Sequence, residues 1–459
     1  MTTPQSPLSN PVFARLFSAQ VTSLAGTGLA TIALALLAYD LAGDAAGTVL
    51  GTALAIKMIA YVFIAPIAGA ITSRLPRRNL LIALDLIRAG VIVCFVFIDQ
   101  VWHIYVLIFI LNACSAAFTP TFQAIIPDIL PDDKEYTRAI AYSRLAYDLE
   151  NLASPTAAAI ALIYLSFDAL FVFNGATFLI SAMLLVSCTL PRPHDILESQ
   201  NTWYNTTSGT LQFMKTPRLR TLLALSFSLA CAGAMVIVNT VIYVQGHLGG
   251  TERHTAIAMA TYGAGSMVAA LLLPKLLEER PDRPFMLGGG LLLVVGLLIG
   301  SNQPGYTTLL IAWFILGLGA SLIQTPAGRL LKRSSNDSNR TQIYAAQFAL
   351  SHACWLVAYP VAGWTGNLIG IEVTFLILAA LSFLGLLLAV VLWPNPDHES
   401  LQHTHKAVSH DHVHIHDDHH QHVHEGWEGE EPHHHSHQHE AKTHSHNFVI
   451  DLHHKLWPS

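Results

Sequence analysis

Histidine dominates the end of this 459-residue chain, because 20 of its 25 histidines lie between residues 397 and 459. In the densest stretches the histidines stand one or two residues apart, at His410, His412, His414, His416, His419, His420, His422, His424, His433, His434, His435, His437 and His439. Neutral imidazole suits Ni²⁺, Co²⁺, Zn²⁺ and Cu²⁺ as a ligand, and the interleaved carboxylates add charge. The composition therefore predicts a segment that binds divalent metal in several overlapping, exchanging sites.

The tail composition narrows the metal only in part. Residues 397–459 contain neither Cys nor Met, the soft ligands that Cu(I) would be expected to use. Imidazole titrates near pH 6.5, so metal binding should be lost as the pH falls through that region. A purification tag and a solvated tail without a role are the plainer interpretations. The polar, charged composition also predicts that the segment is disordered.

A second group of candidates consists of ionisable residues inside apolar segments, where a charge is costly and therefore marks a functional hypothesis. Glu150 is a carboxylate that could exchange a proton for a cation, and Lys57 could instead neutralise it. Arg144 and Asp148 stand four residues apart and share a helical face, which favours an ion pair or a part in a conformational latch. Glu150 lies on a different face from that pair.

Three further ionisable residues complete this group. Asp85 and Arg88 are three residues apart and therefore lie on one face of the same helix. His352 stands near the middle of an apolar segment, where it could serve as a metal ligand or simply pack between helices. We list all of these residues as candidates for transport or coupling.

The segments that position these residues are long and apolar. A membrane-spanning helix needs about 20 predominantly apolar residues, and the chain is 52% hydrophobic with only 12% charged residues. Twelve such segments are expected, at 12–39, 48–72, 79–98, 104–126, 138–164, 169–190, 221–245, 255–276, 285–301, 307–330, 342–365 and 372–393. This excludes an ordinary soluble enzyme, a secreted disulfide-rich domain and a nucleic-acid-binding protein.

The loops between the segments predict the orientation. With the N-terminus in the cytoplasm, 17 of the 21 Lys and Arg residues before residue 397 fall on the cytoplasmic side, as the positive-inside rule requires. An even number of spans returns the tail to the same side. We expect an N-terminal half at 1–190, a cytoplasmic connection at 191–220, a C-terminal half at 221–393 and the tail at 394–459.

The loop after the second segment carries a recognisable motif in residues 69–78. It matches the loop signature G-x-x-x-D-R-x-G-R-R of the major facilitator superfamily at Gly69, Arg74, Arg77 and Arg78. It departs from the signature at Ser73, where the family has Asp, and at Pro76, where it has Gly. The resemblance extends over residues 12–393. It implies an all-α membrane fold of two six-helix halves with a substrate path between them.

Together with the cytoplasmic His-rich tail, the chain resembles the nickel-resistance permeases of this superfamily. The resemblance implies export of Ni²⁺, in some cases with Co²⁺, and metal binding by the tail. We therefore expect a monomeric proton antiporter of the bacterial inner membrane whose partners are metal cations, protons and the lipid bilayer. No resident cofactor and no nucleic acid are expected.

Two other functions remain open from the sequence. The body could export an organic compound, a drug or a siderophore, while the tail only buffers or senses metal. Alternatively, the chain could be a membrane-tethered metal store or sensor. An enzyme is the least favoured class, because neither a catalytic constellation nor a nucleotide-binding G-x-x-x-x-G-K-[ST] motif occurs.

Overall fold

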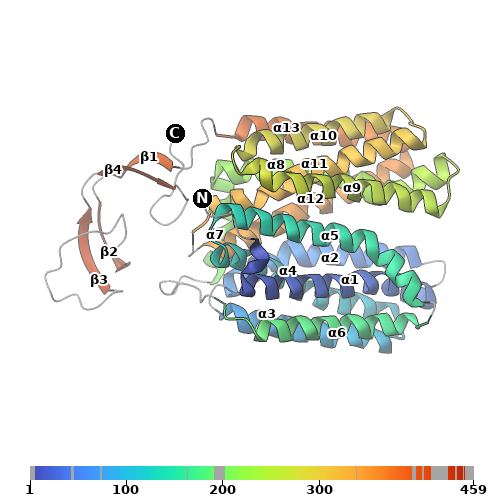
Figure 1. The fold of residues 1–459 in the computed structure, drawn as a ribbon, viewed down its shortest axis with the longest axis horizontal. Coiled ribbons are helices and arrows are strands. Elements are labelled where there is room, and N and C mark those ends of the chain that lie inside the picture. Colours follow the sequence, from blue (N-terminus) through green and yellow to red (C-terminus); the bar gives the residue numbers. More distant parts are fainter. Residues whose placement is uncertain are drawn as a thin grey trace.

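Long helices in two groups make up the body of the protein, in a computed structural model (Figure 1). The structure describes residues 6–42, 46–72, 75–162, 164–190, 202–336, 339–394, 400–405, 408–414, 433–439, 442–447 and 449. The N-terminal half contains α1 (Pro11–Ala42), α2 (Ala46–Thr72), α3 (Arg77–Cys94), α4 (Val101–Ile129), α5 (Asp133–Leu162) and α6 (Phe167–Val186). The C-terminal half contains α8 (Pro217–Val241), α9 (Glu252–Leu277), α10 (Asp282–Ser301), α11 (Tyr306–Arg333), α12 (Arg340–Leu368) and α13 (Ile371–Leu392).

Every predicted apolar segment lies on one of these helices. Among the described residues, nine helices are long and apolar enough to cross a membrane, and α2 adds a shorter apolar run at Thr52–Ala68. The remaining two, α5 and α12, pack against the opposite half, on α9 and α2 respectively. Because protein rather than lipid covers one side of each, they can carry more polar residues.

Short elements complete the body. The 3-10 turn η1 (Pro7–Ser9) precedes α1, and the 3-10 turn η3 (Phe95–Phe97) follows α3. The π-helix η4 (Ile242–His247) continues α8. Within the predicted connection 191–220 the structure has an additional helix, α7 (Thr202–Lys215). α7 packs on α12, where the Gln212 side chain accepts a hydrogen bond of 3.0 Å from the Asn339 amide. The central connection is therefore attached to the helix bundle.

Small residues allow the helices of the C-terminal half to approach closely, a common device in membrane bundles. A Cβ added at Gly317 of α11 would lie 1.9 Å from the carbonyl oxygen of Tyr262 on α9. A Cβ at Gly265 of α9 would lie 2.1 Å from the carbonyl oxygen of Phe314 on α11. The backbones of α9 and α11 are thus in direct contact at two points.

We expect Gly317→Val to disrupt this contact, because the backbone that a side chain would meet cannot move aside without separating the helices. The variant should lose at least half of the monodisperse protein recovered after detergent extraction, measured by size-exclusion chromatography. Gly288→Val is the matched control, since a Cβ there meets no atom within 4 Å. Equal recovery of the two variants would contradict the close packing of α9 on α11.

The described part of the tail contains four strands, β1 (Ser400–His405), β2 (Val408–His414), β3 (His433–His439) and β4 (Lys442–Asn447). β1 pairs with β4 and β2 with β3, both antiparallel, with His410 opposite His437 and His412 opposite His435. These strands differ from the disordered tail that the composition predicts. Histidine at every second position matches the two-residue period of a strand, which explains why this stretch can form one. The strands lie at the end of the bundle that carries α7 (Figure 1).

Candidate functional site

A carboxylate shared by two arginines joins the halves where α4 ends. Asp128 of α4 forms ion pairs with Arg77 at the start of α3 and with Arg340 at the start of α12. The three side chains are only 16%, 5% and 10% exposed, respectively. A carboxylate has enough acceptor sites for two guanidinium groups, so one acid connects two arginines from different halves.

A tyrosine pair lies beside this ion-pair cluster. The hydroxyl oxygens of Tyr136 on α5 and Tyr344 on α12 are 2.8 Å apart, and both side chains are buried. Tyr136 also donates a hydrogen bond of 3.2 Å to the carbonyl oxygen of Gly328 on α11. The Lys332 ammonium, further along α11, lies 2.6 Å from a carboxylate oxygen of Asp133. The start of α5 is therefore attached to two helices of the other half.

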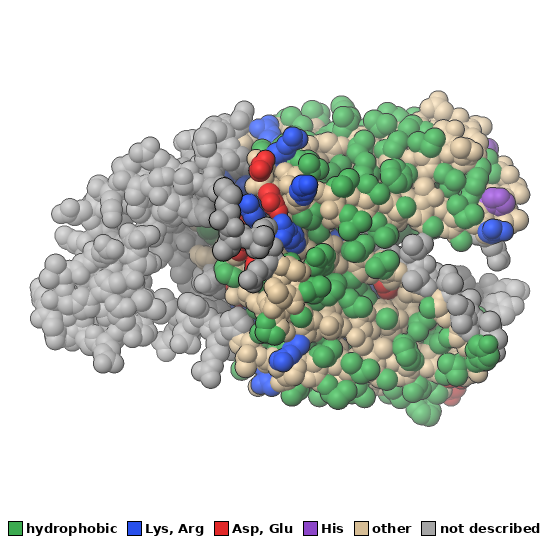
Figure 2. Space-filling view, in the orientation of Figure 1, with side chains coloured by type: hydrophobic (Ala, Val, Ile, Leu, Met, Phe, Trp, Pro, Cys, Tyr) green, Lys and Arg blue, Asp and Glu red, His purple; other side chains and the backbone are tan. Residues whose placement is uncertain are grey.

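A third connection runs from α5 to the end of α9. Arg138 and Lys134 both pair with Glu278, at 2.5 Å and 3.7 Å. We call the whole cross-half set the inner gate, which comprises Asp128, Asp133, Lys134, Tyr136, Arg138, Glu278, Lys332, Arg340 and Tyr344. It lies at the end of the bundle next to α7 and the tail, whereas the halves part at the opposite end in Figure 2. These contacts hold the two halves together on the tail side.

Deeper in the bundle, Arg144 of α5 reaches across to the C-terminal half. Its guanidinium donates to the Gln324 side chain on α11 at 2.6 Å and to the Ser266 hydroxyl on α9 at 3.2 Å. The side chain of Asp148 lies outside the described residues, so its pairing with Arg144 stays a prediction. Arg144 therefore forms a polar link between the two halves.

Glu150 faces α1 rather than the C-terminal half. Gly28 of α1 leaves room for it, because a Cβ there would lie 2.8 Å from Glu150 Oε1 and 1.9 Å from Ser154 Oγ. Lys57 of α2 is close enough to act on Glu150 electrostatically. Glu150 and Arg144 thus lie on different faces of α5, as their six-residue separation predicts.

His352 lies at the interface of α12 and α2. Its Nδ1 is 2.7 Å from the carbonyl oxygen of Phe348, and its ring contacts the Tyr61 ring edge-on with centroids 4.7 Å apart. The Lys57 ammonium lies over the Tyr61 ring, 5.6 Å from its centre. Lys57 therefore connects the surroundings of Glu150 with those of His352.

Asp85 and Arg88 form a buried ion pair inside the N-terminal half. The Ser181 hydroxyl of α6 donates to the second carboxylate oxygen of Asp85 at 2.7 Å. The Arg88 guanidinium also stacks on the Phe118 and Phe178 rings, 4.1 Å and 4.6 Å from their centres. The structure holds this pair among α3, α4 and α6 and does not bring it to Glu150, Lys57 or His352.

The residues of the signature loop at 69–78 differ in the contacts that they make. Arg77 reaches Asp128 and so supports the inner gate. Arg78 donates to the carbonyl oxygens of Leu185 and Val186, which fixes the start of α3 to the end of α6. Gly69 lies in the last turns of α2, and Arg74 is outside the described residues.

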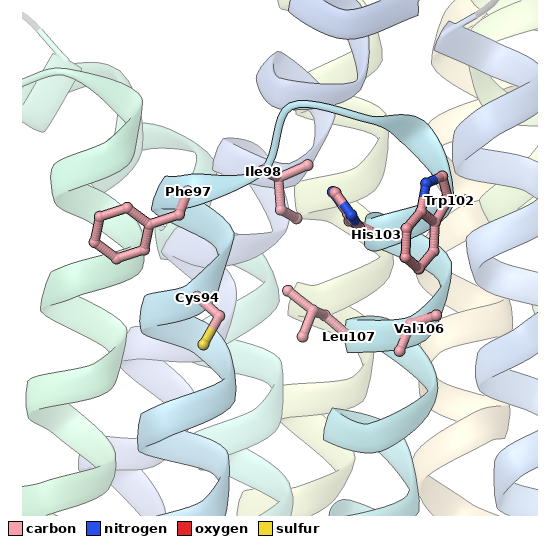
Figure 3. A pocket seen from close by; sticks show the side chains of 7 residues that line it. All are labelled: Cys94, Phe97, Ile98, Trp102, His103, Val106 and Leu107. Atoms are coloured by element: carbon pink, nitrogen blue, oxygen red, sulfur yellow. The ribbon is translucent and has the colours of Figure 1, made fainter.

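At the opposite end of the bundle, the turn between α3 and α4 holds a small apolar pocket of about 340 Å³. In Figure 3, His103 from the first turn of α4 and Phe97 from η3 are among the side chains that line this pocket. His103 Nδ1 is 3.0 Å from a carboxylate oxygen of Asp99. The pocket lies within the N-terminal half, because all its lining residues belong to α3, η3, α4 or the turn between them.

The described residues contain no group of three or more His, Cys, Asp or Glu side chains placed to hold one metal ion. Of the tail candidates, His410, His412, His414 and those from His433 to His439 lie on β2 and β3, where only the backbone pairing is described. His416, His419, His420, His422 and His424 lie outside the described residues. The tail remains the predicted metal-binding segment.

Sequence reasoning missed most of the inner gate. Asp128, Glu278 and Arg340 lie at the ends of long apolar segments, where charged residues are ordinary loop residues in a hydropathy profile. Their clustering at the ends of α4, α9 and α12 was the available signal. Only the packing of the halves shows that they are partners.

Comparison with known proteins agrees with this architecture. The sequence profile of the Major Facilitator Superfamily matches residues 16–246 and 222–427. The chain is 22% identical to the uncharacterized MFS-type transporter YfiS of Bacillus subtilis, over 70% of this chain and 78% of that protein. It is also 22% identical to macrolide efflux protein A of Streptococcus pyogenes, over 57% of this chain and 65% of the relative.

Solved structures show the same fold. The human organic anion transporter MFSD10 superposes with a TM-score of 0.73 at 14% identity, over 84% of this chain and all of that one. The transporter FucP in its outward conformation superposes with a TM-score of 0.65 at 16% identity, over 83% of this chain and 99% of that one. These relatives are transporters rather than enzymes. This protein is a multi-pass membrane protein that belongs to the major facilitator superfamily.

Proposed function

We propose that this protein exports divalent transition-metal cations, nickel first and cobalt second, in exchange for protons. The observation that carries the proposal is the position of the His-rich tail, whose strands lie at the inner-gate end of the bundle (Figure 1). The distribution of Lys and Arg favours the cytoplasm as the location of that end. A chelating tail on this side concentrates metal that is already inside the cell, which favours efflux.

The geometry suggests how such export would proceed. With the inner gate closed, the path between the halves faces away from the cytoplasm, and opening the gate would expose it to the tail. Glu150 supplies a carboxylate that can balance a cation in one state and carry a proton in the other. Moving each positive charge outward costs about 2.3 kcal/mol per 100 mV, so protons returning inward would supply the driving force.

Removing the tail should distinguish its role in supplying metal from the transport of metal by the helix bundle. In a metal-sensitive bacterium that lacks its own metal exporters, the full chain should raise nickel tolerance and lower cell-associated nickel. A truncation ending at Pro396 should keep part of this effect, because the path lies in the helix bundle. Metal content is counted by mass spectrometry, with Co²⁺, Zn²⁺ and Cu²⁺ tested in parallel.

Two results would overturn nickel export. Unchanged tolerance to every metal would leave the cargo of the body open. Raised tolerance accompanied by raised cell nickel, lost with the truncation, would identify the protein as a membrane-tethered store.

Export of an organic compound is the second candidate. The relationship to macrolide efflux protein A favours it, as does the absence of a three-ligand metal group among the described residues. Reduced accumulation of a labelled macrolide, with no change in cell metal, would select this candidate over metal export.

A further inference from the structure

Two buried cysteines of the C-terminal half lie on neighbouring helices, α8 and α12. Cys231 of α8 is 0% exposed and Cys354 of α12 is 9% exposed, and both belong to the same hydrophobic core. The Cys354 thiol donates to the carbonyl oxygen of Leu350, 3.3 Å away. A buried free cysteine can be simply a small apolar residue, so the relative position of the two thiols decides whether they form a site.

Contacts between α8 and α12 place the two cysteines at the same level of the bundle. The Gln347 amide of α12 donates to the Ser226 hydroxyl of α8 at 3.4 Å, and these residues are 121 apart in the chain. The Asn239 amide of α8 donates to the carbonyl oxygen of Ala362 on α12 at 3.1 Å, with a separation of 123 residues. The helices therefore run in the same direction with a nearly constant offset. The two cysteines are also 123 residues apart, lie between these contacts, and are close enough to act on each other electrostatically.

The helices around the two thiols carry almost no charge. Residues 221–241 of α8 contain no Lys, Arg, Asp or Glu, and neither do residues 341–368 of α12. The third helix, α13, packs on both and has Glu372 in its first turn as its only charged residue. A cation entering this core would lose its water without a carboxylate to balance its charge. The surroundings therefore favour a ligand that is neutral before it binds.

We propose that Cys231 and Cys354 form a dithiol site that binds neutral compounds of trivalent arsenic, a soft element that matches sulfur ligands. Each S–H bond breaks as an As–S bond forms, and each thiol proton leaves with a hydroxyl group of the arsenic compound as water. Arsenic and sulfur keep their oxidation states, so the step needs neither an oxidant nor a reductant. An arsenic atom between the two sulfurs also spans a wider gap than a direct disulfide bond.

This dithiol site differs in chemistry from the His-rich tail. Imidazole is a borderline ligand that suits Ni²⁺ and Co²⁺, whereas the core offers two thiols and, among the described residues, no third His, Cys, Asp or Glu that completes a metal site. The proposal therefore goes beyond nickel export and does not depend on it. Binding to the purified protein tests it separately from any transport assay.

The test uses the full chain in lipid nanodiscs, with phenylarsine oxide as the probe. An excess of the monothiol 2-mercaptoethanol then removes arsenic that is held by a single cysteine. Arsenic held by two cysteines is retained, because both As–S bonds must open before it can leave. We expect intact-protein mass spectrometry to show one retained arsenic on each chain, and the dithiol 2,3-dimercaptopropanol to release it.

Substitutions identify the two sulfurs. Cys231→Ala and Cys354→Ser should each retain at least tenfold less arsenic than the unsubstituted protein, and a serine at 354 can still donate to the Leu350 carbonyl. Cys114→Ala is the matched control, since Cys114 is equally buried but lies on α4 of the other half. Proteolysis of the unsubstituted protein should yield an arsenic-bridged pair of peptides from α8 and α12. This peptide mapping keeps the test decisive even if a variant does not fold.

Two results would overturn the proposal. Complete removal of arsenic from the unsubstituted protein by 2-mercaptoethanol would mean that the two thiols are too far apart to share one atom and serve only in packing. Arsenic that is retained equally in Cys231→Ala and Cys354→Ser would belong to other cysteines of the chain.

Discussion

For the proposed proton antiport, Glu150→Gln is expected to abolish proton-coupled export, because glutamine keeps the shape of the side chain but cannot carry a proton. In proteoliposomes with an imposed pH gradient, nickel-dependent proton flux should fall by about a hundredfold, the scale of a lost proton-transfer group. Exchange of nickel across the membrane without a pH gradient should persist. The flux is measured with an internal pH-sensitive dye and the exchange with radioactive nickel.

An exposed carboxylate far from Glu150 provides the control for this experiment. Asp99 is 75% exposed and pairs with His103 at the other end of α3 and α4, so Asp99→Asn should leave the coupled flux unchanged. Preserved coupling in Glu150→Gln would assign the proton to another group, with Asp148 and His352 as the next variants to compare. Loss of exchange as well as coupling would instead show that Glu150 is needed to bind the cargo.

Asp128→Asn is expected to open the inner-gate end of the protein, next to α7 and the tail. The substitution removes the charge that two buried arginines share and leaves Arg77 and Arg340 facing each other. Removing one partner of a buried ion pair costs about 3 to 5 kcal/mol. Only the state with the inner gate closed bears this cost, so the population should shift toward the state with the gate open.

Spin labels on the two halves would report this shift. Asn79 on α3 and Lys275 on α9 are exposed residues of different halves near the inner gate. Each is replaced by cysteine for labelling, in a variant from which the five native cysteines have been removed. Double electron–electron resonance should show a longer distance in Asp128→Asn. Asp132→Asn is the control, because the Asp132 carboxylate accepts hydrogen bonds from the backbone at Lys134 and Glu135 within the same half.

The second arginine provides a further check. Replacing Arg340 by glutamine in addition removes the repulsion, so the double variant should recover part of the short distance. An unchanged distance in Asp128→Asn would mean that the tyrosine pair and the salt bridge of Lys332 hold the gate closed without Asp128.

Local sequence patterns determined the helices and one ion pair within a helix. Every expected apolar segment lies on a helix of the structure, since roughly 20 apolar residues in a row leave a membrane helix as the way to satisfy the backbone. Spacing of three residues likewise identified Asp85 and Arg88 as neighbours on one face. These are short-range relationships that a helical period of 3.6 residues fixes.

The tail shows the limit of composition. Its histidine content predicts metal binding, but the same residues were expected to be disordered, whereas the structure pairs 400–405 with 442–447 and 408–414 with 433–439. Pairing of strands depends on which segment lies opposite which, and the composition contains no such information.

The sequence by itself determined that this protein is a bundle of membrane helices with a polar, histidine-rich end. Tertiary structure alone decided which polar side chains from distant segments meet. Arg77 and Asp128 are 51 residues apart, and Arg144 and Gln324 are 180 apart. Such contacts depend on how helix faces pack between distant segments, and a helical period within one segment does not specify that packing.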